Sequence, residues 1–94
     1  MSIEEIRNLI QEMNLRDTKD YQKLNIEQLS DVLRETMEFE RQTLQRIEEF
    51  EKNRVEQDLA NYAKMICKNT VGREISKIQK FYFKKIDKQY LSSN

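Results

Sequence analysis

The sequence predicts an all-α protein, a small helical bundle or helical hairpin of long helices that forms one domain over residues 1–94. Three observations carry this prediction. The chain contains no proline and one glycine, whereas strand-rich domains need turn residues at each hairpin. Charged residues make up 36% of the chain, which is typical of long polar helices. Apolar residues also recur three and four positions apart, the spacing of one helix face.

The first helical segment is expected over about residues 3–26. Ser2 can cap its start, and Glu5 follows at the capping-box spacing. One apolar stripe then runs through Ile3, Ile6, Leu9, Ile10 and Met13. Residues 14–20 break that stripe and are predicted to form a polar connection, with Tyr21 and Leu24 as its anchors.

The second helix is expected over about residues 26–52. Asn25 is its predicted cap, with Gln28 three residues later. Glu40 interrupts the apolar stripe, so we do not expect a regular coiled-coil heptad. A helix from residue 26 to 68 would be about 60 Å long, so we predict a turn near Asn53, with an uninterrupted rod as the alternative. The stripe comprises Ile26, Leu29, Leu33, Met37, Leu44, Ile47 and Phe50.

The third segment, about residues 55–91, carries two apolar stripes that are out of register. At about 100° per residue they point to opposite sides, and the switch falls at residues 69–72. Either the helix breaks there, with Thr70 as a cap and Gly72 as a weak helix former, or it continues and different neighbours bury its two ends. The first stripe is Val55, Leu59, Tyr62, Ala63 and Ile66, and the second is Val71, Ile75, Ile78, Tyr82 and Ile86.

The end of this segment supplies the candidate functional residues. Its aromatic side chains widen the apolar side beyond a narrow seam, as a surface that binds a protein partner would require. The alternative is that this side packs within the chain. The candidate protein interface is Ile78, Phe81, Tyr82, Phe83, Ile86 and Tyr90. The opposite side is basic and could contact nucleic acid through Arg73, Lys77, Lys80, Lys84 and Lys88.

Catalytic chemistry is not expected. The sequence has no histidine, so histidine-based nucleophilic, proton-relay or zinc chemistry is excluded. Cys67 is the only cysteine and is interpreted as a small core residue. The run of Glu48, Glu49 and Glu51 is interpreted as a solvated helix face. We therefore predict a protein that is not an enzyme and that needs no metal or cofactor. Without a signal peptide or an apolar span, it is expected to be intracellular, cytoplasmic or nuclear, and not to contact a membrane.

Charge is unevenly distributed along the chain. Residues 1–58 hold 15 acidic and nine basic residues, and residues 59–94 hold two acidic and eight basic residues. The halves can attract each other or an antiparallel copy, or the basic half can contact nucleic acid. We expect a non-catalytic accessory subunit that binds a larger protein complex, or forms a homo-oligomer. The alternative is a small nucleic-acid-binding protein of weak sequence specificity, because lysines read bases poorly.

Ile78 to Asp87, with the sequence IQKFYFKKID, resembles the last helix of the helical domain of GINS subunits. These proteins belong to the replicative helicase of archaea and eukaryotes. That helix typically contains Arg-x-x-Lys-Ile, and Lys85-Ile86 matches its second half, but Tyr82 stands where the arginine is expected. The resemblance covers about residues 26–88 and lacks the strand-rich second domain of the family. It implies a non-catalytic scaffold that joins proteins of the DNA replication machinery.

Overall fold

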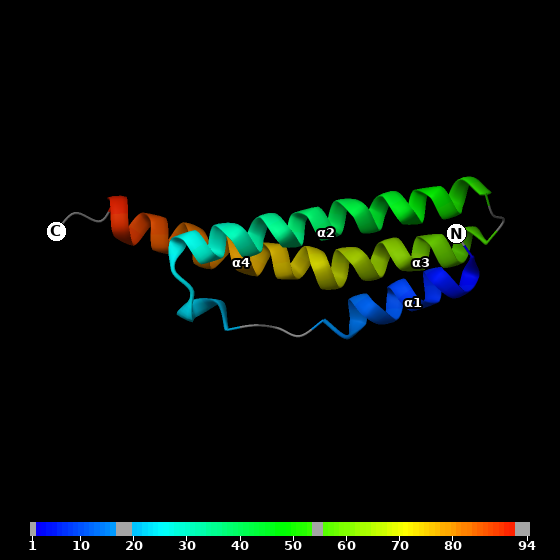
Figure 1. Ribbon diagram of the computed structural model, residues 1–94, viewed down its shortest axis with the longest axis horizontal. Coiled ribbons are helices and arrows are strands. Elements are labelled where there is room, and N and C mark those ends of the chain that lie inside the picture. Colours follow the sequence, from blue (N-terminus) through cyan, green and yellow to red (C-terminus); the bar gives the residue numbers. More distant parts are fainter. Residues whose placement is uncertain (1, 17–19, 54–55, 92–94) are drawn as a thin grey trace.

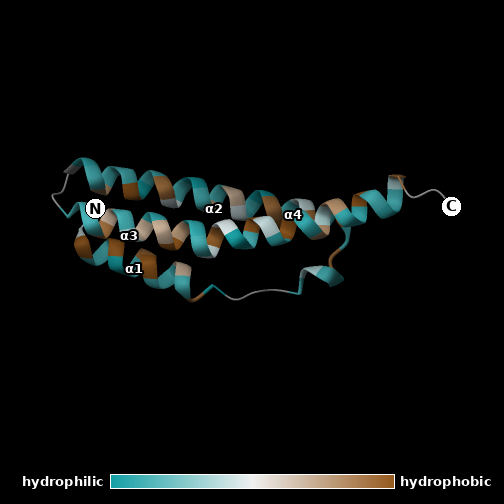
Figure 2. Cartoon of the chain, turned by 180° about the vertical axis from the view of Figure 1, so that it is seen from behind, coloured by the Kyte–Doolittle hydropathy of each residue, from teal (hydrophilic) through white to brown (hydrophobic). Residues whose placement is uncertain are grey.

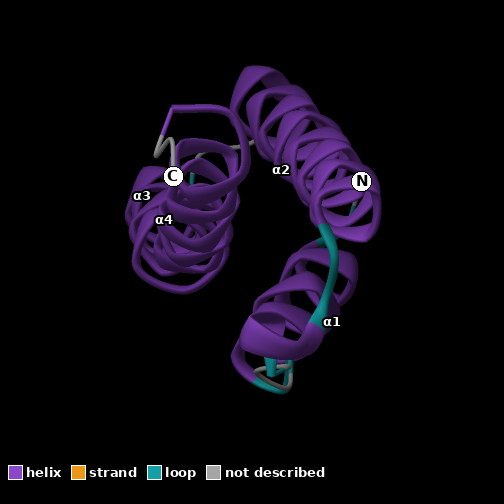
Figure 3. Ribbon diagram, turned by 90° about the vertical axis from the view of Figure 1, so that its left-hand side faces the viewer, coloured by secondary structure: helices purple, strands orange, loops and turns teal. Residues whose placement is uncertain are grey.

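The computed structural model describes residues 2–16, 20–53 and 56–91, and none of these residues lies in a strand. Three long helical segments pack side by side along a rod of 59 × 21 × 17 Å (Figure 1). The end-on view shows α1 covering one side of the pair formed by α2 and the continuous helix of α3 and α4 (Figure 3). The predicted all-α helical bundle is confirmed.

Helix α1 spans Ile3–Asn14 and begins at the predicted cap, where Ser2 Oγ accepts a hydrogen bond of 3.2 Å from the amide of Glu5. Its buried side chains are those of the predicted stripe after Ile3, namely Ile6, Leu9, Ile10 and Met13. The expected segment 3–26 is therefore not one helix. A separate short turn of 3-10 helix, η1, covers Tyr21–Lys23, and Tyr21 anchors it in the core as predicted.

Helix α2 spans Ile26–Asn53. Its start is a complete capping box, in which Gln28 N donates to Asn25 Oδ1 over 2.8 Å and Asn25 N donates to Gln28 Oε1 over 3.0 Å. The buried line along α2 differs from the predicted stripe. Met37 is 48% exposed, whereas Thr36 and Thr43 are buried. Thr36 can be buried because its hydroxyl donates to the carbonyl of Val32 over 2.8 Å.

The predicted turn near Asn53 is confirmed, because α2 ends at Asn53 and α3 starts at Gln57 and returns antiparallel to it (Figure 1). Val55, which the sequence assigned to the next stripe, lies outside the described residues. Glu51 of α2 forms an ion pair with Lys64 of α3 and accepts a hydrogen bond of 2.6 Å from Gln57. These contacts fasten the two helices together next to the turn.

The suggested break at residues 69–72 does not occur. Helices α3 (Gln57–Cys67) and α4 (Arg73–Ile86) are joined by a π-helical turn, η2 (Lys68–Gly72), and a second one, η3 (Asp87–Leu91), ends the helix. A π turn contains one residue more than an α turn, so it takes up about 100° of the rotation between the two predicted stripes. Ala60, Ala63 and Cys67 before it are buried, as are Val71 and Ile75 after it.

Both halves of this long helix pack against α2, so the idea that different neighbours bury its two ends is only partly right. The first half also packs on α1, and the second half also packs on η1. Tyr62, predicted as part of the first stripe, is 46% exposed. Ala63 is buried as predicted, and Ala60 and Cys67 are the other buried positions of α3. These small side chains allow α1 and α2 to approach closely.

The core has two parts along the rod. The larger cluster joins α1 to the end of α2, to α3 and to η2. The smaller cluster is built on Tyr21, Leu29 and Ile78, with Leu24, Val32, Leu33, Phe81 and Tyr82 packed around them. In Figure 2, brown segments that mark hydrophobic residues recur along α4 toward the C-terminal end of the rod. Through Ile78, Phe81 and Tyr82, the smaller cluster packs the last helix against η1 and α2.

Candidate interaction surfaces

The C-terminal end of the long helix extends past the first residues of α2, as Figures 1 and 2 both show. In the described part of the chain, no second helix runs alongside this protruding end. Phe83 is 60% exposed, Tyr90 67% and Leu91 71%. Ile86, one turn from both aromatic rings, is only partly buried. We call Phe83, Ile86, Tyr90 and Leu91 the exposed apolar surface.

The structure separates the six residues of the predicted protein interface into two groups. Ile78 is fully buried, and Phe81 and Tyr82 pack against the smaller core cluster. Phe83, Ile86 and Tyr90 remain accessible, and the ring of Tyr82 meets that of Phe83 edge-on with centroids 5.6 Å apart. Leu91 was missed because the sequence at the chain end resembles a frayed terminus. Its position directly after Tyr90 was the one feature of the sequence that could have placed Leu91 in the predicted interface.

The five predicted basic residues, Arg73, Lys77, Lys80, Lys84 and Lys88, are all exposed. They do not form a uniform stripe. Lys77 lies toward η1, with its Nζ 6.0 Å from the ring centroid of Tyr21. Lys84 and Lys88 border a hollow of about 190 Å³ that Gln22, Phe81 and Lys85 also line. The basic side of α4 is therefore interleaved with a partly exposed aromatic ring.

Lys85, which carries part of the resemblance to GINS subunits, has a structural role here. Its Nζ donates to the carbonyl oxygen of Gln22 over 2.8 Å and also to that of Leu24. These carbonyls lie at the end of η1, just before α2 begins. Lys85 thus ties the connection between α1 and α2 to the last helix.

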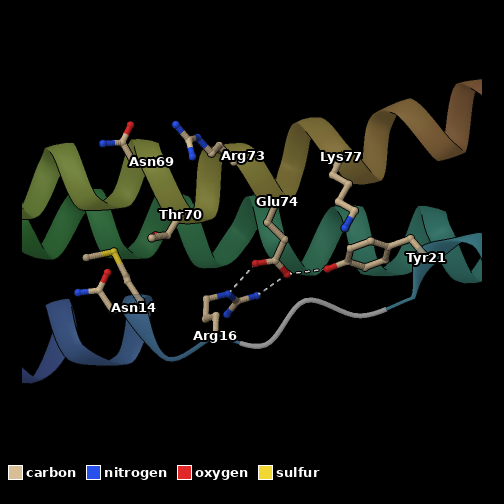
Figure 4. A pocket seen from close by; sticks show the side chains of 9 residues that line it. Asn14, Arg16, Tyr21, Asn69, Thr70, Arg73, Glu74 and Lys77 are labelled. Atoms are coloured by element: carbon tan, nitrogen blue, oxygen red, sulfur yellow. Dashed lines mark hydrogen bonds and ion pairs between the residues drawn. The ribbon is translucent and has the colours of Figure 1, made fainter.

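A second polar junction holds the other end of that connection (Figure 4). The guanidinium of Arg16 donates from Nε to Glu74 Oε2 over 2.9 Å and from Nη2 to Oε1 over 3.1 Å, and the Tyr21 hydroxyl donates to Oε1 over 2.9 Å. The hydrogen bonding of Arg16 to the Glu74 carboxylate raises the pKa of Arg16. The guanidinium also stacks 4.4 Å from the ring centroid of Phe39. The junction borders a hollow of about 260 Å³ that Arg73 and Lys77 also line.

The remaining chemically distinctive residues are engaged in packing. Cys67 is buried, and burial raises the pKa of its thiol, with the nearby Glu40 carboxylate adding to the effect. The hydrogen bond from Lys64 lowers the pKa of Glu51, and the hydrogen bond from Gln57 makes the next largest contribution in the same direction. In the described part of the chain, no three Cys, Asp or Glu side chains are placed to hold a metal ion. Over the same ranges, no helix is both long and apolar enough to cross a bilayer.

No known protein family, no curated protein and no solved structure matches this sequence. The similarity to GINS subunits therefore depends on the residues of α4 named above.

Proposed function

We propose that this chain is a non-catalytic accessory subunit that docks on a larger protein through the exposed apolar surface of α4 and η3. The observation that supports this most directly is the exposure of Phe83, Tyr90 and Leu91 near the end of the long helix, which extends past the first residues of α2. Aromatic side chains held on a rigid helix lose little conformational freedom on binding, so they contribute strongly to protein interfaces.

The clustering of these residues matters more than the exposure of any one of them. Single exposed apolar side chains are normal on protein surfaces. Met37 on α2 and Met65 on α3 are such cases, at 48% and 49% exposed. Phe83, Ile86 and Tyr90, in contrast, are spaced three and four residues apart on one helix. They form a continuous strip, which matches the anchor spacing with which a helix binds a groove.

The proposed setting is an assembly of the DNA replication machinery. The motif in α4 supports it, since Lys85-Ile86 matches the second half of the GINS pattern. Tyr82 replaces the arginine of that pattern and packs against the smaller core cluster. In this chain the motif therefore contributes to the fold that presents Phe83 and Tyr90, and the partner is expected to contact those two rings.

A non-catalytic role is supported by the state of the reactive groups. The sequence contains no histidine, and its one thiol is buried with a raised pKa. A thiol nucleophile needs a lowered pKa and access to substrate, and Cys67 has neither. The carboxylate of Glu74 is occupied by Arg16 and Tyr21.

Affinity purification followed by mass spectrometry tests this proposal. We would compare the wild-type chain with the double variant Phe83→Ser/Tyr90→Ser. A matched control, Met37→Ser/Met65→Ser, also removes two exposed apolar side chains. We expect at least one protein to co-purify with the wild type and the control but not with the first variant. If the same proteins are recovered with all three chains, the exposed apolar surface is not the docking site.

A further inference from the structure

We propose that the other side of α4 binds single-stranded nucleic acid, with a base stacked on Phe81 and phosphates on Lys77, Lys84 and Lys88. We call these four residues the lysine–Phe81 surface. The proposal is independent of the protein-docking function, because it uses none of the residues of the exposed apolar surface.

Helix geometry places these residues in a row. They are spaced four, three and four residues apart, so they follow one side of the helix over about 16 Å at 1.5 Å per residue. All three lysines are exposed, and Phe81 is partly exposed beside them. The row therefore presents a line of positive charge with an aromatic ring in its centre.

The ring of Phe81 is held in place before any ligand binds. One part of it packs against the smaller core cluster of Tyr21, Leu29 and Ile78. The other part borders the hollow of about 190 Å³ that Lys84, Lys85 and Lys88 also line. Lys85 donates to the carbonyls of Gln22 and Leu24, whereas Lys84 and Lys88, on the same hollow, are exposed.

This combination matches single strands better than duplexes. Proteins that bind single strands without sequence preference pair a positively charged track with aromatic side chains on which bases stack. In a duplex the faces of the bases are already stacked on each other, so no base would be free to stack on the ring of Phe81. Lysines contact phosphates as point charges and read base edges less well than arginine does. We therefore expect little sequence preference.

The acidic residues of the same helix do not oppose this binding. Glu74 is occupied by Arg16 and Tyr21. Asp87 is turned about a third of a turn away from Phe81 at roughly 100° per residue. By the same count, Phe83 points about 200° away from Phe81. A protein partner on Phe83 and a strand on Phe81 can therefore be bound at the same time, which would let the subunit hold a single strand next to its partner.

Fluorescence anisotropy of a labelled 20-nucleotide oligothymidylate, titrated with the full chain, tests the proposal. If three phosphates are neutralised, affinity should fall about 20-fold between 50 and 200 mM monovalent salt. The double variant Lys84→Gln/Lys88→Gln should reduce the logarithmic salt slope by about 1.4. The control Arg46→Gln/Lys52→Gln removes the same charge from exposed positions of α2 and should leave the slope unchanged.

The ring is tested separately from the charges. Phe81→Leu keeps an apolar side chain in the core cluster but removes the stacking surface, so it should weaken binding about tenfold with an unchanged salt slope. A thermal melt of each variant shows whether it is folded at the assay temperature, and the lysine variant tests the surface even if Phe81→Leu is unstable. The variant Phe83→Ser/Tyr90→Ser should bind the oligonucleotide like the wild type, even where it has lost a protein partner.

Several results would overturn the proposal. One is the absence of binding at 50 mM salt. Another is a duplex of the same length that binds as tightly as the single strand, because stacking on Phe81 would then play no part. A third is competition by polyglutamate. If polyglutamate displaces the labelled oligonucleotide as effectively, per charge, as unlabelled oligonucleotide does, the surface is a site for acidic proteins instead.

Discussion

Arg16 and Glu74 lie 58 positions apart in the sequence and are joined by two hydrogen bonds of 2.9 and 3.1 Å. Tyr21 donates a third hydrogen bond to the same carboxylate. The two ends of the segment that connects α1 to η1 are thereby held to a single side chain of α4 (Figure 4). This junction fixes α1 against the long helix and so completes the third side of the bundle.

Replacing Glu74 with Ala should lower the free energy of unfolding by about 2 kcal/mol. The change removes the acceptor of three hydrogen bonds, and the Glu74 side chain is only 10% exposed. Urea denaturation measures the loss. Glu35→Ala, on an exposed position of α2, is the matched control and should change stability by less than about 0.5 kcal/mol. Equal effects of the two substitutions would show that the junction does not stabilise the fold.

Lys85→Met should loosen η1 without unfolding the bundle. The substitution keeps an apolar stem of similar length but removes the donors to the carbonyls of Gln22 and Leu24. We expect a loss of about 1–2 kcal/mol and faster hydrogen exchange of the backbone amides of residues 21–25. Lys80→Met serves as the control, because Lys80 is exposed. Unchanged exchange in the Lys85 variant would contradict the role assigned to this lysine.

Ile78 and Phe83 should respond in opposite ways to truncation. Ile78 is fully buried in the smaller cluster, so Ile78→Ala should cost about 2–4 kcal/mol through lost burial and the cavity left behind. Phe83 is 60% exposed, so Phe83→Ala should change the free energy of unfolding by less than about 0.5 kcal/mol. Denaturant titrations of both variants check this. A large loss for Phe83→Ala would mean that its ring packs within the chain and is not a docking residue.

Cys67 should make stability fall as the solution becomes alkaline. Burial raises the pKa of the thiol above its ordinary value of 9.0, so above about pH 9 the unfolded chain loses this proton while the folded chain keeps it. The free energy of unfolding therefore falls as pH rises. The difference in unfolding free energy between wild type and Cys67→Ala isolates this effect and should shift against the wild type between pH 8 and 10.5. A difference that is independent of pH would contradict it.

The sequence was sufficient for the features that depend on local chemistry. The caps at Ser2 and Asn25 follow from side chains that can reach free amides three residues away, and the turn after Asn53 follows from the length limit of a small domain. The burial of Cys67 was also predicted correctly. The caps depend on neighbours in the chain, whereas the turn and the buried thiol follow from general limits of domain size and residue type, so no particular distant contact had to be known.

Other features depend on contacts that no local pattern contains. Tyr62 and Met37 fit an apolar stripe by spacing but are exposed, because the true seam uses Ala60, Thr36 and Thr43 instead. The polar junction of Arg16 with Glu74 could not be predicted, since both residues resemble solvated charges in the sequence. The division of the aromatic residues between core and surface required the position of η1, which packs against one part of Phe81 and leaves Phe83 exposed.

The π-helical turn at Lys68–Gly72 has a consequence for length changes in this chain. It contains one residue more than an α-helical turn needs, so losing one residue there would convert it to ordinary helix and keep α3 and α4 in phase against α2. The same deletion a few residues later, inside α4, would instead rotate everything downstream by about 100°. Related chains that differ by one residue in this region can thus share the same outward-facing rings, provided that the gap falls within this single turn.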